Sequence, residues 1–261
     1  MDMSDALHHD RRRAGSFGDD AELYDRARPP YPAEMVDALM AEGPRSVLDV
    51  GCGTGIASRL FQARGCQVLG LEPDSRMASV ARRQGLMVDE GSFEEWEAKG
   101  RLFDLLIAGQ AWHWVDPQVG QQKAAGALHP GGRLGLFWNQ SFPAAEARAV
   151  MNRVYGRLAP ALGESSVLIG RRDGSMYESI ASVARSTGRF GDVSVEAYAH
   201  DMSYSTTEWL NLATTHSDHR TLPPAARRAL LDGLRIAIDG IGGQVPVRYE
   251  TTLVTARTLA L

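Results

Sequence analysis

The chain has 261 residues, a formal net charge of -4 and two cysteines. Its 44% hydrophobic and 23% charged residues are ordinary for a globular enzyme. The negative charge argues against a nucleic-acid partner or an anionic membrane surface, and no stretch approaches the roughly 18 apolar residues of a membrane span. Because the first residues contain no apolar segment, we expect a cytoplasmic protein in which Cys52 and Cys66 stay reduced.

Short apolar runs alternate with helical patterns through the first half of the chain. This alternation predicts an α/β fold in which parallel strands are covered by helices. We expect helices at residues 32–41, 56–64, 75–84 and 117–128, and a turn at 129–132. The expected strands are residues 46–50, 67–73, 86–91, 103–109 and 133–139.

The second half has a different pattern. Residues 144–190 favour helices, whereas residues 193–204 and 245–258 alternate as half-buried strands do. Antiparallel neighbours need only a tight turn, so the long helical stretch between these two strands is expected to be an insertion with its own role. The expected organisation is an N-terminal lid segment with the first helix at 1–43, then a domain at 44–261 with helical lid insertions at about 144–190 and 205–243.

Three glycines follow the first expected strand directly. Gly51, Gly53 and Gly55 allow a ligand to approach the backbone closely and let the next helix point its N-terminus at that ligand. The dinucleotide fingerprint G-x-G-x-x-G would need a third glycine where this chain has Ile56. Glu72 ends the second strand, where a carboxylate accepts hydrogen bonds from the ribose of any adenosine-containing ligand. Since the chain has no G-K-[ST] phosphate loop, the pattern favours an adenosine ligand without a pyrophosphate.

The motifs VLDVGCGTG, LGLEPD and HPGGRLGLFWN together resemble those of class I S-adenosylmethionine-dependent methyltransferases. The segments RARPPYP, GQAWHWVD and ATTHSDHRTLP resemble the small-molecule subgroup related to trans-aconitate methyltransferase. The resemblance covers essentially the whole chain. It implies a doubly wound, Rossmann-like seven-stranded sheet with an antiparallel last strand and a helical lid, and S-adenosyl-L-methionine as the cofactor.

The resemblance also assigns cofactor contacts to the glycine loop (residues 51–55) and to the strand ends around it. The loop passes under the methionyl and ribose groups, Asp49 anchors it or reaches the cofactor's amino group, and Glu72 holds the ribose hydroxyls. The family often has an aspartate at the adenine edge where this chain has Gly91 and Ser92. The expected cofactor-binding residues are Tyr24, Arg28, Asp49, Gly51, Gly53, Thr54, Gly55, Glu72, Pro73, Met77, Ser92, Phe93 and Gln110.

His113 follows the fourth expected strand and is the candidate catalytic residue. Methyl transfer is an in-line displacement that depends mostly on positioning, and an imidazole there can take the proton from an acceptor hydroxyl. In the alternative interpretation His113 is a structural histidine that shapes the loop beneath the cofactor. Of the flanking Trp112 and Trp114, we expect one in the core and the other as a pocket wall.

The acceptor is expected between the N-terminal segment and the second insertion. The candidate acceptor contacts are Tyr31, Trp114, His216 and Arg220, with Arg220 suited to an anionic group because guanidinium binds carboxylate through two hydrogen bonds. His216 and His219 share one helix face by spacing, but no further residue has metal-ligand spacing, so no metal is expected.

The sequence predicts a methyltransferase that acts on a small-molecule acceptor, at a hydroxyl or carboxylate oxygen, as a monomer or homodimer. The segment GQAW lacks the N/D-P-P-Y/F tetrapeptide of enzymes that methylate base amines, which also argues against a nucleic-acid substrate. Two alternatives stay open at this point. One is an NAD(P)-dependent reductase, and the other is a non-catalytic homologue that binds the cofactor only.

Overall fold

The computed structural model describes residues 17–163, 168 and 174–259 of the chain. Over this part, seven strands form one sheet in the order β3-β2-β1-β4-β5-β7-β6. β1 to β5 pair in parallel, whereas β7 is antiparallel to both of its neighbours, so the predicted seven-stranded Rossmann-like sheet is confirmed. The strands are β1 (Ser46–Val50), β2 (Gln67–Glu72), β3 (Met87–Glu90), β4 (Phe103–Gly109), β5 (Leu128–Pro143), β6 (Phe190–Ser205) and β7 (Gln244–Thr258).

Side-chain caps begin several of the helices. Asp116 accepts hydrogen bonds from the amides of Gln118 and Val119 at the start of α7, and Ser205 forms a capping box with Glu208 at the start of α11. The helices and 3-10 turns are η1 (Phe17–Asp20), α3 (Ala21–Ala27), α4 (Ala33–Met40), α5 (Ile56–Gln62), α6 (Ser75–Arg83), η2 (Trp112–Trp114), α7 (Pro117–Ala127), α8 (Ala145–Leu158), α9 (Pro160–Gly163), α10 (Ser175–Ser186), α11 (Thr206–Thr214), α12 (Ser217–Arg220) and α13 (Pro224–Asp239).

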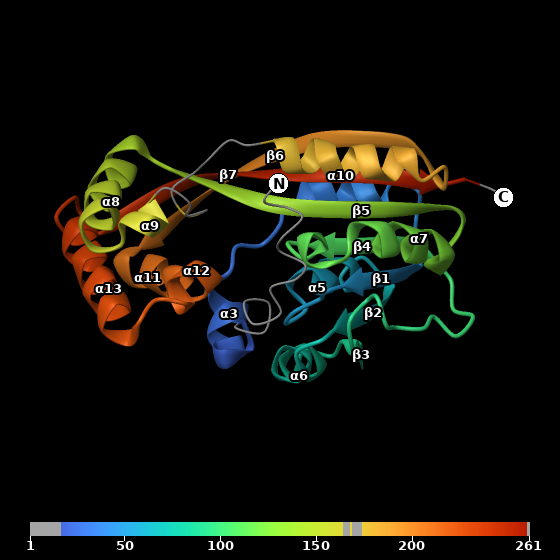
Figure 1. The fold of residues 1–261 in the computed structure, drawn as a ribbon, viewed down its shortest axis with the longest axis horizontal. Helices are drawn as coiled ribbons and strands as arrows, with labels where there is room; N and C mark the ends of the chain where they lie inside the picture. The colour runs from blue at the N-terminus through green and yellow to red at the C-terminus, as the bar shows by residue number, and fades with distance from the viewer. Residues whose placement is uncertain (1–16, 164–167, 169–173, 260–261) are drawn as a thin grey trace.

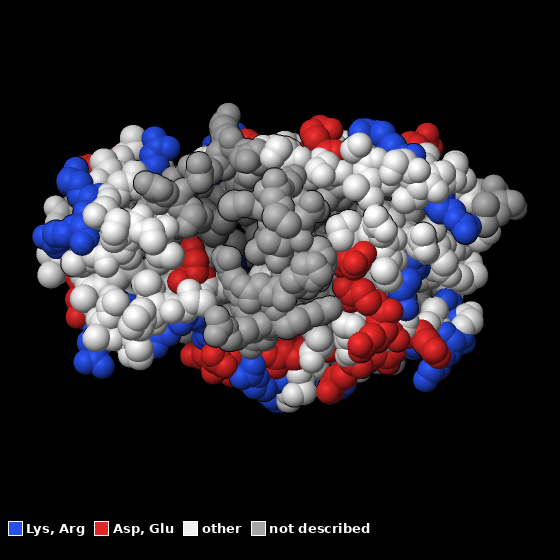
Figure 2. Space-filling model, viewed as in Figure 1, with Lys and Arg blue, Asp and Glu red and all other residues white. Residues whose placement is uncertain are grey.

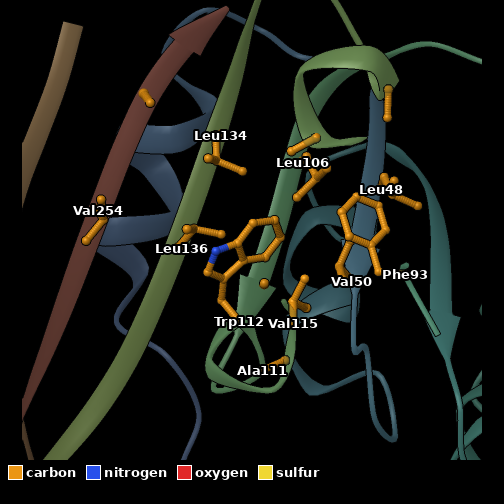
Figure 3. Packing of buried hydrophobic residues seen from close by; sticks show 14 of the residues in the cluster. Leu48, Val50, Phe93, Leu106, Ala111, Trp112, Val115, Leu134, Leu136 and Val254 are labelled. Atoms are coloured by element: carbon orange, nitrogen blue, oxygen red, sulfur yellow. The ribbon is translucent and has the colours of Figure 1, made fainter. Parts of the chain in front are cut away.

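Helices cover both faces of the sheet (Figure 1). On one face α7 and α10 pack against a core cluster that includes Leu48, Leu106 and Leu136, part of which is drawn in Figure 3. On the other face α4 and α5 pack around Val47 and Phe137. Because neighbouring strand residues point to opposite faces, Val47 and Leu48 belong to different clusters, as a doubly wound sheet requires.

β5 and β7 are much longer than β1 to β4 and carry the lid. The pairing of β5 with β4 ends at Phe137, but its pairing with β7 continues to Pro143. Beyond β4, these strands and β6 form an antiparallel extension on which α8, α9, α11, α12 and α13 are mounted (Figure 1). These five helices are called the lid. Their apolar faces meet the extension in a cluster that includes Trp209, Val247 and Tyr249.

Two ranges differ from the sequence prediction. β5 begins at Leu128 rather than after the expected turn at 129–132, because Leu128 pairs with Phe103 before a shift in register. Within the expected lid range 144–190, α10 packs on the sheet instead, where Tyr177 lies 5.3 Å from Trp138 between ring centroids. Residues 1–16 of the expected N-terminal segment lie outside the described part.

The N-terminal strap, defined as residues 17–31, lies between the lid and the sheet (Figure 1). Ion pairs attach it to α6, including Arg76 with Asp19 at 2.7 Å and Arg83 with Glu22. Figure 2 shows acidic and basic side chains interspersed along this edge. Among the helices that the structure describes, none is long and apolar enough to cross a membrane.

Candidate cofactor and acceptor site

The glycine loop adopts a backbone that side chains disfavour. Gly51, Gly53 and Gly55 have φ angles of +67°, +58° and +88°, in the left-handed region that glycine adopts readily. A Cβ atom on Gly51 would lie 2.6 Å from the Cβ of Ala111. The Gly51 amide also donates to the Leu71 carbonyl at 2.8 Å, which holds the loop close to the sheet. The loop is therefore a cradle that only a bare backbone can form.

Asp49, at the end of β1, is buried beneath this loop with one oxygen unused. Its Oδ2 accepts a hydrogen bond from the Ser58 hydroxyl at 2.5 Å, whereas Oδ1 has no hydrogen-bond partner within the described residues. Burial raises the pKa of Asp49 to about 7, against the hydrogen bonds from Ser58, which lower it. A buried oxygen without a donor is costly, so this atom is suited to a ligand that brings one, such as an amino group.

Glu72 braces the glycine loop from β2. Its carboxylate accepts hydrogen bonds from the Gly53 amide at 2.9 Å and from the Asp74 amide at 3.0 Å. Burial raises the pKa of Glu72 to about 7, although these two amides lower it. Each carboxylate oxygen has two lone pairs, so ribose hydroxyls can still donate to Glu72 while the amides stay bound. The bare loop, the unused Asp49 oxygen and this carboxylate together fit S-adenosylmethionine.

Arg59 and Asp25 attach the strap to the glycine loop, and sequence reasoning missed both. Arg59 donates from Nη1 to the Thr54 carbonyl at 3.0 Å and from Nη2 to the Asp25 carboxylate at 2.9 Å. Met77 is buried below α3, with its methyl carbon 3.4 Å from where a Cβ of Gly53 would stand. The sequence carries no local signal for the Asp25 contact, because the two ionic partners are 34 residues apart.

The expected adenine side is divided between surface and core. Pro73 is exposed and Ser92 is half-buried, so both lie at the rim of the site. Phe93 is 3% exposed and packs against Trp112, with ring centroids 5.8 Å apart. Figure 3 shows its ring beside Leu48, inside the core cluster. The Phe93 ring therefore forms the apolar floor of the expected adenine side.

His113 is held by an indole that sequence reasoning did not single out. Its Nδ1 accepts a hydrogen bond from Trp138 Nε1 at 3.1 Å, and an indole nitrogen can only donate. A neutral His113 therefore carries its proton on Nε2, which then donates and cannot accept a proton. This geometry favours the structural or hydrogen-bonding interpretation of His113 over that of a general base.

The other residues after β4 also face β5 or the core. Gln110, with a φ angle of +58°, donates from Nε2 to the Asn139 carbonyl at 3.1 Å. Trp112 is 3% exposed and points into the core cluster beside Leu136 (Figure 3), whereas Trp114 is half-buried. Trp112 is thus the core residue of the pair, and Trp114 is left as the pocket-wall candidate.

Tyr31 connects the strap to the strand ends. Its ring meets Phe137 edge-on at 4.6 Å between centroids, and its hydroxyl lies 2.7 Å from where a Cβ on Gly109 would stand. Burial raises the pKa of Tyr31 well above its usual value, and the charges of Tyr24 and Asp49 raise it further. Tyr31 therefore stays protonated as a hydrogen-bond donor beside Asp49.

Arg28 connects the strap to the lid. Its guanidinium lies over the Tyr24 ring at 4.7 Å from the centroid and donates from Nη2 to the Thr215 carbonyl at 3.0 Å. Its positive charge lowers the pKa values of Tyr31, Tyr249 and His216, each of which burial shifts more strongly. Arg28 thus contacts both the strap and the lid, and its charge also acts on Tyr249 of β7.

Arg220 is engaged by protein groups. Its Nε donates to the Thr214 carbonyl at 3.1 Å, and its Nη1 lies 3.7 Å from the Asp19 carboxylate. Burial lowers the pKa of Arg220, and Asp19 raises it. Arg220 therefore ties α12 to the strap, while the neighbouring His216 lies at the start of α12.

A buried polar chain within the lid was also missed by sequence reasoning. The Tyr155 hydroxyl lies 2.8 Å from His219 Nε2, and His219 Nδ1 lies 2.7 Å from the Asp218 carboxylate. This chain ties α8 to α12, although helical periodicity indicates only an apolar role for Tyr155. Across residues 17–163, 168 and 174–259, no group of three or more His, Cys, Asp or Glu side chains is placed to hold a metal ion.

Comparison with known proteins shows similarity to methyltransferases. The methyltransferase domain family matches residues 48–136. An uncharacterised methyltransferase of Mycobacterium tuberculosis is 40% identical over 126 residues, which cover 48% of this chain and 52% of that protein. The match thus spans about half the length of that relative. A trans-aconitate 2-methyltransferase of Methylobacterium radiotolerans is 28% identical over 229 residues, 83% of this chain and 85% of that protein.

Solved structures show the same fold. A proposed type II methyltransferase from Anaeromyxobacter dehalogenans superposes with a TM-score of 0.63 at 21% identity, over 90% of this chain and 99% of that one. Phosphoethanolamine N-methyltransferase 2 of Haemonchus contortus, solved with S-adenosyl-L-methionine, gives a TM-score of 0.54 at 15% identity, over 100% of this chain and 61% of that one. The described chain thus has the seven-stranded fold of these methyltransferases, and its sequence matches the methyltransferase domain family over residues 48–136, which include the glycine loop.

Proposed function

We propose that this protein transfers a methyl group from S-adenosylmethionine to an oxygen of a small acceptor bound between the strap, the lid and the ends of β4 and β7. The observation that carries this proposal is the unused Oδ1 of Asp49, buried directly before a loop whose glycines admit a ligand. We further propose a cytoplasmic protein, monomeric or homodimeric, that works without nucleic acid or membrane.

Bound S-adenosylmethionine supplies an electrophilic methyl group on a positively charged sulfur. Asp49 would accept hydrogen bonds from its amino group, and Glu72 from its ribose hydroxyls. Tyr24, Arg28 and Met77 would cover it from the strap and α6, while Gln110, Ser92 and the floor formed by Phe93 border it. Because the strap and lid close the site from two sides, the chain contributes mainly by orienting the reactants and excluding water.

The acceptor side offers positive charge and hydrogen-bond donors. The Tyr31 hydroxyl lies beside Gly109 at the end of β4, and the Arg28 guanidinium lies between Tyr24 and the Thr215 carbonyl, which suits an acceptor with an anionic group. We propose that His113 donates from Nε2, that Trp114 forms a wall and that Arg220 contributes positive charge from α12. The trans-aconitate relative supports a small oxygen acceptor, although its name describes that protein alone.

Calorimetry and an acceptor screen test the proposal. We expect the protein to bind S-adenosylmethionine, and Asp49→Asn to bind it more weakly. Isotope-labelled S-adenosylmethionine is then incubated with separate panels of hydroxy compounds and carboxylic acids, and products are scored by the mass of the transferred methyl group. Cofactor binding without any product would favour the non-catalytic homologue, and absence of binding would refute the assigned site.

A further inference from the structure

His216 differs from the other lid histidine in its hydrogen bonding. Both ring nitrogens of His219 are used, one by Tyr155 and the other by Asp218. The His216 ring has no hydrogen bond to any described residue and touches the His219 ring edge-on, with centroids 6.4 Å apart. The structure therefore holds one half-buried imidazole at the start of α12 whose nitrogens are available to a small molecule.

The position of His216 is set by the strap. Arg28 donates to the carbonyl of Thr215, the residue directly before His216, so a guanidinium lies beside the backbone that carries this imidazole. Figure 1 shows α12 at the end of the lid that faces α3. Because Arg28 also lies over the Tyr24 ring, His216 directly follows a residue that contacts the strap, the segment that carries these two expected cofactor-binding side chains.

The surroundings keep His216 unprotonated. Burial lowers the pKa of His216 well below the usual value, and the neighbouring Arg28 and His219 lower it further, whereas Asp218 raises it. The Asp218 carboxylate is hydrogen-bonded to His219 and not to His216. At neutral pH the His216 ring thus has one nitrogen ready to accept a proton.

The other histidines near the sheet are less suited to this role. His113 has its accepting nitrogen bound to Trp138. His200 also lacks a hydrogen-bond partner among the described residues, but it stacks on Tyr249 at 5.2 Å between centroids, and its charged neighbours are Asp201 and Glu34 rather than Arg28.

From these contacts we infer that His216 is the general base of the reaction and that the acceptor oxygen is a hydroxyl. This inference rests on the proposed function. The hydroxyl proton moves to a ring nitrogen of His216, and the oxygen's electron pair forms the new bond to the methyl carbon. The carbon–sulfur bond breaks with its pair remaining on sulfur, and the imidazolium then releases its proton to water.

The protonation state of His216 is tested first, without cofactor or acceptor. Histidine ring signals are followed by NMR from pH 5 to pH 8, with His216→Asn assigning the resonance and His129→Gln, at the exposed start of β5, as the control. We expect His216 to titrate below the usual value of about 6.5, and Arg28→Gln to raise that midpoint. A midpoint at or above the usual value would overturn the inference.

The second test measures turnover with the acceptors that the panels of hydroxy compounds and carboxylic acids identify. We expect hydroxy compounds to be methylated, and His216→Asn to lower kcat about 100-fold or more while cofactor affinity changes less than about twofold. As the pH falls, wild-type kcat should decrease with the same midpoint as the His216 NMR titration. This decrease should be absent in His216→Asn, and His129→Gln should match wild type. Methylation of carboxylates alone, or near-normal kcat in His216→Asn, would refute the base. Cofactor binding with no product in wild type would instead refute the proposed function.

Discussion

The two halves of the site are built by different means. Around the cofactor, the chain uses the backbone of residues 51–55 and two carboxylates that lie next to it in neighbouring strands. Around the proposed acceptor position, contacts join distant segments, such as Arg28 with Thr215, 187 residues apart, and Tyr155 with His219, 64 residues apart. A ligand common to a whole family can be bound by a local motif, whereas a particular acceptor requires contacts that only the complete fold brings together.

The largest effect of a single substitution is expected where one methyl group is added to the glycine loop, and the quantity affected is the affinity for the cofactor. Gly51→Ala places a side chain on a residue with φ of +67° and 2.6 Å from the Ala111 Cβ. The left-handed backbone costs roughly 1–2 kcal/mol and the overlap typically another 1–3 kcal/mol. We expect the affinity for S-adenosylmethionine, measured by calorimetry, to fall about 100-fold or more.

Two further variants separate loop geometry from general instability. Gly126→Ala, in α7 with open space around it, is the matched control and should gain about 0.5–1 kcal/mol of stability without altering cofactor affinity. The double change Gly51→Ala with Ala111→Gly removes the overlap but not the backbone strain, so it should recover only part of the affinity. Full affinity in Gly51→Ala alone would show that the loop does not need a bare backbone.

Glu72→Ala should have the second largest effect. It removes a charged acceptor from the ribose and also releases the Gly53 amide, so we expect a loss of roughly 1.5–3 kcal/mol in cofactor binding. Glu72→Gln keeps the shape and one accepting oxygen and should retain part of the affinity. Titration calorimetry with folded protein measures both, and unchanged affinity in Glu72→Ala would contradict the assignment.

The same contrast explains what the sequence could predict. The bounds of β1 and β4 follow from apolar runs closed by polar residues or glycine. Asp49 and Glu72 were singled out as site candidates because they lie at strand ends next to the glycines. The predicted β5 was too short at its start. The strand begins with Leu128, which pairs with Phe103, and the glycine-rich register shift that follows resembles a turn in the sequence.

Residues that act through distant partners escaped sequence reasoning. Trp138 was assigned to a strand, and nothing local shows that its indole nitrogen binds His113. Tyr249 alternates as any strand residue does, yet the charge of the distant strap residue Arg28 lowers its pKa. Contacts of this kind depend on where the antiparallel extension places the lid, and periodicity does not encode that placement.

The carboxylates predict a pH dependence confined to the cofactor half. Because burial raises the pKa values of Asp49 and Glu72 to about 7, both take up protons as the pH falls through neutrality in the ligand-free protein. Their ionised forms bind the cofactor, so a protonated carboxyl group must first lose its proton. The affinity for S-adenosylmethionine should therefore fall by about tenfold per pH unit below pH 7 for each such group.

The effect on stability has the opposite sign. A raised carboxyl pKa stabilises the ligand-free fold at low pH, and this stability is lost as the pH rises through about 7. The rise in melting temperature on adding S-adenosylmethionine should therefore be larger at pH 8 than at pH 6. Asp49→Asn removes one titrating group and should flatten the profile, while equal affinity in wild type at pH 6 and pH 8 would contradict the prediction.

The smallest expected effect tests the ion pair that connects the strap with the glycine loop. Asp25→Asn removes the ionic partner of Arg59, which also holds the Thr54 carbonyl of the glycine loop. Because the pair is partly exposed, its loss should weaken cofactor binding by only about 0.2–1 kcal/mol, and less at high salt.

Glu22→Gln, which breaks the exposed pair between the same helix and Arg83, is the matched control because Arg83 has no contact with the loop among those the structure describes. Calorimetry at low and high salt distinguishes the two. If both variants lose the same affinity, α3 acts only as a general cover, and if Asp25→Asn alone loses affinity, Arg59 transmits the closure of the strap to the loop.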